Sequence, residues 1–212
     1  MTFTTAERFA SAYWDALQAS MGDTSTWIDN FLADPVGAAL APALQFDGFI
    51  IGANPYLAPG DHLADQVPPE LPTGCPFPCA PFDFPDGGAA ALQDPFAGPS
   101  LIAGPLYYDN VALNDVLVQG LGLNSVYDFF TNVEHLGISL FQAQAVVTLG
   151  VISAAHELQD GNFSEAIGAV DQAFFGSPVS DDVPEGSALN EGAIQTVLTA
   201  LSYFGSADLP EV

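Results

Sequence analysis

The chain has 212 residues, of which 49% are apolar, so one domain with a sizeable hydrophobic core is possible and a disordered chain is excluded. It contains 26 Asp and Glu residues but a single Lys or Arg, Arg8, and its net charge is −25. The acidic content is ordinary for a protein, so the unusual feature is the near absence of Lys and Arg. Nucleic acids and anionic lipid head groups need Lys and Arg to meet their phosphates, and they are therefore unsuitable partners.

The first 53 residues predict helices. Residues 1–15 include charged Glu7 and Arg8 and no long apolar run, so we expect no signal peptide in this form. Apolar residues recur at helical intervals within residues 4–21 and again after residue 23, up to Pro35. Residues 36–53 are almost wholly apolar but are interrupted by Pro and Gly, which predicts a kinked buried helix or a helix followed by a turn.

Residues 55–105 form a segment of a different kind, because twelve of the 17 prolines of the chain lie there. No long helix or strand is compatible with this spacing, so we expect a long irregular insertion. Its large aromatic residues, among them Phe77, Phe82 and Phe84, predict that it packs on the domain and presents a recognition surface.

Cys75 and Cys79 stand close together in this insertion. A local disulfide is our first interpretation, and it would imply an oxidising compartment. Two reduced thiols and a metal-binding pair are the alternatives, although a metal would need two further ligands.

Regular periodicity returns after Tyr108 and predicts a helix from Val111 to Leu121 and another that begins at Asn124. Residues 136–155 carry no charge, a length that would span a bilayer. Polar residues near the middle and the lack of flanking Lys or Arg favour a central bundle helix, so a membrane span is not expected. An interfacial or partner-binding helix is the other alternative.

The last part of the chain predicts two more helices. Asp160, Gly161 and Asn162 predict a turn, and Asn162 with Glu165 has the spacing of a helix cap. A helix to about residue 175, an acidic loop over 176–187 and a final helix before Gly205 complete the pattern. The sum is a single all-α domain, residues 1–212, with a bundle of six or seven helices and the insertion over 55–105.

Few residues suggest chemistry. HELQD, residues 156–160, matches the first two positions of a zinc protease motif but has Asp160 where the second His stands. It supplies only two of the three ligands of a catalytic zinc, and a solvated helix end explains it as well. No serine elbow or phosphate-binding loop is found, so we expect no enzyme and no cofactor.

Two segments of the chain have a characteristic composition. AAHELQDGNFSEAIGAVDQAFFGSP, residues 154–178, and DNFLADPVGAALAPAL, residues 29–44, resemble the lysine-poor helical segments of exported mycobacterial envelope proteins, including regions downstream of PE and PPE modules. The PE and PPE signatures and the serine elbow of some relatives are absent, so the resemblance implies no activity. It implies a location at or beyond the cell envelope and a role in interaction or assembly.

Three functions follow, in order of preference. The first is a non-catalytic exported or surface-associated protein that binds a protein partner or itself through apolar helix faces and the aromatic insertion. The second is a carrier for a lipid or another apolar ligand, held between bundle helices. The third is a metal-dependent hydrolase built on HELQD. The ligand-lining residues expected for the second are Phe129, Phe130, Phe141, Phe174 and Phe175.

Overall fold

The described residues of the chain are helical, as the sequence predicts. The computed structural model describes residues 28, 31–61, 111–176 and 185–206, and within these ranges it contains helices and loops and no strand. The elements in chain order are α3 (Pro35–Gln45), η1 (Phe46–Ile51), η2 (Asn114–Gly120), α7 (Asn124–Gln159), α8 (Phe163–Phe175) and α9 (Ala188–Ser206). Six helices in this part of the chain agree with the predicted all-α bundle.

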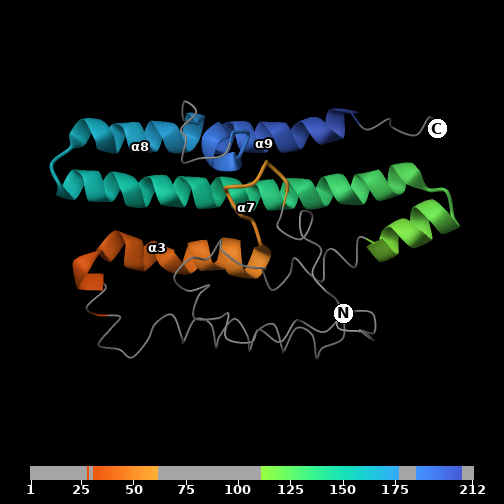
Figure 1. Ribbon diagram of the computed structural model, residues 1–212, viewed down its shortest axis with the longest axis horizontal. Coiled ribbons are helices and arrows are strands. Elements are labelled where there is room, and N and C mark those ends of the chain that lie inside the picture. Colours follow the sequence, from red (N-terminus) through yellow and green to blue (C-terminus); the bar gives the residue numbers. More distant parts are fainter. Residues whose placement is uncertain (1–27, 29–30, 62–110, 177–184, 207–212) are drawn as a thin grey trace.

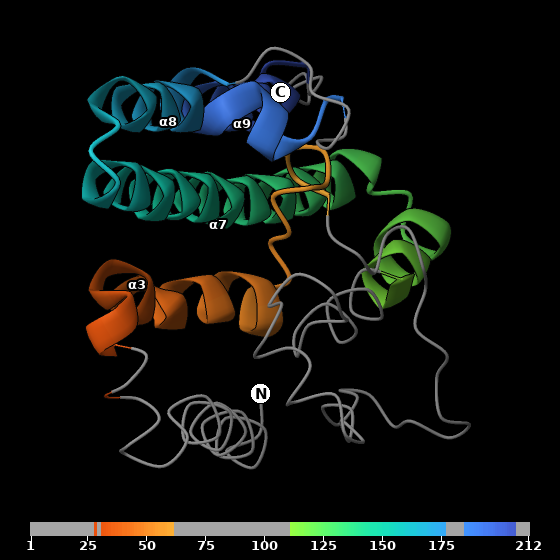
Figure 2. The ribbon, with the colours of Figure 1, turned by 60° about the vertical axis from the view of Figure 1, so that its left-hand side comes forward.

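Helix α7 is the centre of the arrangement. Figures 1 and 2 show α3 along one side of α7 and α8 and α9 along the other, with α8 and α9 following one another back along α7. All other described helices contact α7. The predicted helix that begins at Asn124 and the uncharged segment 136–155 belong to one helix of 36 residues, which runs from Asn124 to Gln159. In the described part of the chain, α7 is the one helix long and apolar enough to cross a membrane.

The turn between α7 and α8 lies where the sequence predicts it. Gly161 has φ of 81°, and the amides of Gly161 and Asn162 donate to the carbonyls of Leu158 and Glu157 (3.2 and 2.8 Å). This pattern closes the end of α7 and reverses the chain. The predicted side-chain cap of α8 was wrong: Asn162 makes no side-chain cap bond, and its Nδ2 donates to Glu157 Oε2 (2.9 Å).

Helix α3 begins with a complete cap. Asp34 Oδ1 accepts a hydrogen bond from the Gly37 amide (2.9 Å), and Pro35 occupies the first turn, where no amide donor is needed. The helix continues through Pro42 and passes into the π-helix η1, which ends at Ile51 and is followed by Gly52 with φ of 83°. The helix-and-turn interpretation of residues 36–53 was therefore correct, although most of α3 is only partly buried.

A loop over residues 52–61 crosses α7 and is fixed by one side chain, Gln142. The Gln142 Oε1 atom accepts from the Gly60 amide (2.9 Å), and Nε2 donates to the carbonyls of Asn54, Ala58 and Asp61 (2.9–3.1 Å). The same loop accepts from α9, since the amides of Ala188 and Leu189 donate to Leu57 and Pro55 (2.8 Å each). Gln142 is fully buried. The loop therefore connects η1, α7 and the start of α9 on one side of α7.

The core between α7, α8 and α9 consists mainly of small residues. Val146, Ala173 and Ala188 form its central cluster, and Leu189 packs against it. A Cβ atom on Gly150 of α7 would lie 2.3 Å from the Cβ of Ala173, so the two helices are in direct backbone contact there. Small residues at a crossing allow helices to approach closely and leave no room for large side chains between them. The large apolar side chains of these helices must then lie elsewhere.

Candidate partner-binding surface

Large apolar side chains lie on the exterior of α7, α8 and α9. Phe163 and Phe175 are each 69% exposed and Ile167 is 71% exposed, although Ala166 and Ala173 on the same helix are buried. Single exposed apolar residues are normal, whereas a contiguous patch indicates a binding surface. The remaining exposed large apolar residues of the three helices are Val126, Phe129, Phe130, Val133, Leu140, Val151, Leu158, Val170, Phe174, Ile194, Leu198 and Leu201.

Two open hollows make part of this exterior contiguous. The first has a volume of about 560 Å³ and lies where α7, α8 and α9 meet, and the second has a volume of about 400 Å³ and lies between α7 and α8. Phe174 lines both, so the hollows adjoin. We call their combined surface the apolar face. The residues of this face used below are Leu140, Val147, Leu158, Phe163, Ile167, Val170, Phe174 and Leu198.

The apolar face has the repeat of a helix-packing seam. Along α7, residues 140, 144, 147, 154 and 158 line the hollows, and together with the exposed Val151 they recur at alternating intervals of four and three. Along α8, residues 163, 167, 170 and 174 repeat the same intervals. Side chains with this spacing receive the side chains of another helix packed at a small angle. The α7 row is about 27 Å long at 1.5 Å per residue, which is about five helical turns.

The polar groups at the apolar face are few. Gln144 lines the first hollow and is exposed. Thr148 is buried and donates to the Gln144 carbonyl of its own helix (2.8 Å), so its hydroxyl is satisfied. Asp171 lines the second hollow and also a third one of about 440 Å³, which contains Glu157 and Glu165. Among Asp, Glu, Lys and Arg, only Asp and Glu occur on α7, α8 and α9. The surface is therefore apolar along its centre and acidic beside α8.

The predicted aromatic residues do not share one site. Phe174 lines both hollows and Phe175 lines the second. Phe129 packs edge-on against Phe130 and against Phe204 of α9 (ring centroids 6.0 and 6.3 Å apart), before the apolar face begins. Phe141 packs on Phe46 of η1 (5.9 Å). Phe77, Phe82, Phe84, Cys75 and Cys79 lie outside the described residues, and their roles stay predictions.

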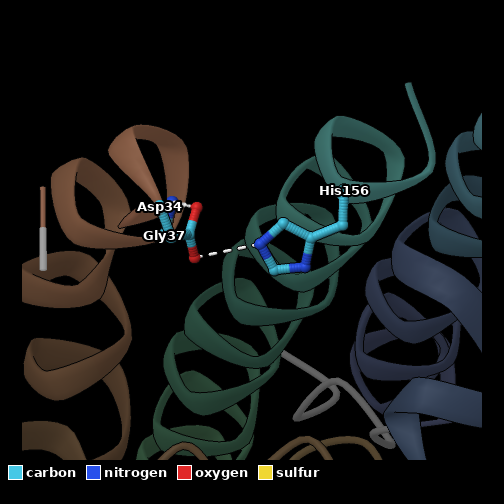
Figure 3. Close-up of polar contacts among 3 residues, drawn as sticks. All are labelled: Asp34, Gly37 and His156. Carbon is cyan, nitrogen blue, oxygen red and sulfur yellow. Dashed lines mark hydrogen bonds and ion pairs between the residues drawn. The ribbon is translucent and has the colours of Figure 1, made fainter. Parts of the chain in front are cut away.

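His156 of the HELQD segment pairs with a residue far away in the sequence. Its Nε2 atom lies 2.9 Å from Asp34 Oδ2, while the other oxygen of Asp34 caps α3 (Figure 3). The hydrogen bond from the Gly37 amide and the pairing with His156 lower the pKa of Asp34. Among the described residues, no group of three His, Cys, Asp or Glu side chains is arranged to hold a metal ion. The segment therefore joins the end of α7 to the start of α3.

Asp47 is a second unusual polar residue. Its side chain is fully buried in η1, and neither carboxylate oxygen has a hydrogen-bond partner. Burial raises its pKa from 3.8 to about 7. Ser139 of α7 is likewise buried with an unpartnered hydroxyl. An unpaired buried carboxylate is destabilising when it is charged, so this group is best tolerated when protonated.

Sequence reasoning did not identify Leu140, Val147, Ile167 and Leu198 as surface residues. Their spacing fits a buried core equally well, and the signal that decides is the row of small residues, such as Ala166 and Ala173, beside them on each helix. Comparison with known proteins found no matching family model, no matching curated protein and no matching solved structure.

Proposed function

We propose that this chain is a non-catalytic interaction protein, exported or associated with the cell surface, that binds another protein through its apolar face. The observation that carries the proposal is the inverted distribution of side-chain size on α8: Ala166 and Ala173 are buried and Phe163 and Ile167 are exposed. Exposed apolar area of this kind costs solubility unless a partner covers it. The Phe/Pro insertion is a further candidate contact region.

Burial of the apolar face is the source of the expected affinity. Transfer of an exposed Phe or Ile side chain from water to an interface contributes about 1.5–3 kcal/mol. A few such residues near the centre of a patch usually supply most of the binding energy. Phe163, Ile167 and Phe174 are the residues expected to do so here, because they line the hollows and their side chains are exposed.

A photo-crosslinking experiment tests the proposal. A photoreactive amino acid at Ile167 is expected to give a protein adduct of defined mass in an envelope extract. The same probe at Val116 of η2, which is also exposed and lies outside the apolar face, is the control and should give none. Equal adducts at both positions would show that contact is non-specific and would contradict the proposal.

Native mass spectrometry distinguishes the carrier function from the protein-binding function. Both hollows of the apolar face are open to solvent, whereas a carrier normally encloses most of its ligand. A lipid retained by the gently extracted protein, and lost on Ile167→Gln, would replace the proposed function with a carrier. Recovery of the protein in the soluble cytoplasmic fraction alone would contradict the proposed location.

A further inference from the structure

We infer that the occupant of the apolar face is one amphipathic helix of a different protein, with a central apolar row and Lys or Arg along its edges. This inference rests on the proposed function and specifies the partner. Two neighbouring features support it. The apolar rows on α7 and α8 have helix-packing intervals, and the charged residues of the surface beside them are all acids.

The shape of the face favours a helix over an irregular chain or a lipid tail. The rows on α7 and α8 both repeat at intervals of four and three residues, and the two helices lie side by side. A third helix placed over them presents its own residues at the same intervals, so its side chains enter the spaces between Leu140, Val147 and Ile167. A helix of about five turns matches the length of about 27 Å.

Charge selects the partner. Asp171 lines the second hollow directly, whereas Glu157 and Glu165 line the third hollow, on the other side of the contact between α7 and α8. The whole chain offers Arg8 as its single Lys or Arg against 26 acids. A second copy would therefore bring like charges together at neutral pH, and an anionic bilayer would be repelled in the same way. A helix with basic edges meets opposite charge at Asp171 and in the net charge of −25 of the whole chain.

Designed helical peptides test the inference on the full chain. The first peptide has Leu at intervals of four and three over about five turns, with Lys along both edges. The second keeps the Leu row and has Glu edges, and the third keeps the composition of the first with scrambled spacing. Binding is measured by fluorescence anisotropy at low and at high salt.

The Lys-edged peptide is expected to bind, and the Glu-edged peptide to bind at least about tenfold more weakly, because like charges across an interface oppose association. Raising the salt should reduce this difference. The scrambled peptide should also bind more weakly, since its apolar side chains do not form one row.

Variants locate the binding site. Ile167→Gln should weaken the Lys-edged peptide about tenfold or more, as expected for a central contact residue. Val116→Gln, the matched control outside the face, should leave binding unchanged. Asp171→Asn should weaken the Lys-edged peptide and should not weaken the Glu-edged peptide. All three positions lie on helices, and Ile167 and Val116 are exposed, so folding should be retained.

The outcomes separate this inference from the proposed function. Equal binding of Lys- and Glu-edged peptides, with loss on Ile167→Gln, would overturn the charge selection and leave the protein-binding function standing. A dimer in light scattering that Ile167→Gln dissociates would make the occupant a second copy and overturn the inference. Binding to neutral lipid vesicles but to none of the peptides would overturn both.

Discussion

The two sides of α7 differ in whether their side chains find partners within the chain. On one side, Gln142 is buried and its amide makes four hydrogen bonds to the loop over 52–61, so this closed side is complete within the chain. On the other side, Leu140, Val147 and Leu158 line hollows that are open to solvent. A single residue, Phe141, separates Leu140 from Gln142. The closed side holds the fold together, and the open side is free to bind, so substitutions should affect stability on the first and association on the second.

The largest effect on stability is expected at Asp47, at the start of the closed side. Its pKa is near 3.8 in the unfolded chain and about 7 in the folded chain, so the folded chain binds the proton more tightly. The free energy of unfolding therefore falls as pH rises from about 4 to about 7, by at most about 4 kcal/mol from this group. Asp47→Asn should remove this part of the pH dependence.

The measurement is urea unfolding of both chains between pH 4 and pH 8. Repulsion among the other acids also grows with pH, so the quantity that matters is the difference between wild type and Asp47→Asn. A difference that stays constant over this range would contradict the assignment. Peptide binding at the apolar face should be the same for both chains wherever both are folded.

The next largest effect is expected at Gln142, and Gln144 provides a matched control. Gln142→Leu leaves the Gly60 amide and three loop carbonyls without their buried partner, and we expect a loss of about 3 kcal/mol. Gln144 is exposed on the same helix, so Gln144→Leu should change stability by less than about 0.5 kcal/mol. Equal losses for the two variants in chemical denaturation would show that the loop does not depend on Gln142.

The contrast between Gln142 and Gln144 also shows how far the sequence could be interpreted. Both residues are polar positions in the uncharged segment 136–155. No feature of the neighbouring sequence shows which of the two is buried. The turn at Gly161 and the helix after Asn124 were predictable because their signals are local. The burial of Gln142 depends on a loop more than 80 residues away in the sequence, and no local pattern contains that contact.

The site was less predictable for the same reason. Phe174 and Phe175 were correctly placed on a helix, but their grouping with Phe129 and Phe141 assumed that aromatic residues fill the space between helices. Ala173 and Gly150 fill it instead, and their close approach turns the larger side chains outward. Which side of a helix is core is decided by its neighbours, and helical periodicity gives only the existence of an apolar side.

A smaller effect is expected where α7 and α8 cross. The added Cβ of Gly150→Ala would overlap the Cβ of Ala173, and overpacking of this kind costs about 2 kcal/mol. Gly137→Ala is the control, because a Cβ there meets nothing within 4 Å and Ala favours the helix by up to about 1 kcal/mol. Thermal unfolding should therefore move in opposite directions for the two variants. Because α8 is displaced in Gly150→Ala, this variant should also weaken peptide binding, which links the seam to the open side.

The smallest effect is expected at Asp34, where the cap of α3 and the pair with His156 can be separated (Figure 3). Asp34→Ala removes both and should cost about 1 kcal/mol, mainly from the cap. Asp34→Asn keeps an oxygen that accepts from the Gly37 amide, so it should lose only the exposed pair, which contributes less than about 0.5 kcal/mol. Since the pKa of Asp34 is lowered in the folded chain, its charge stabilises the fold above its unfolded pKa and ceases to do so as pH falls below about 4. Urea unfolding at neutral pH and near pH 3 measures both contributions, and equal losses for Asn and Ala at neutral pH would assign the effect to charge instead of to the cap.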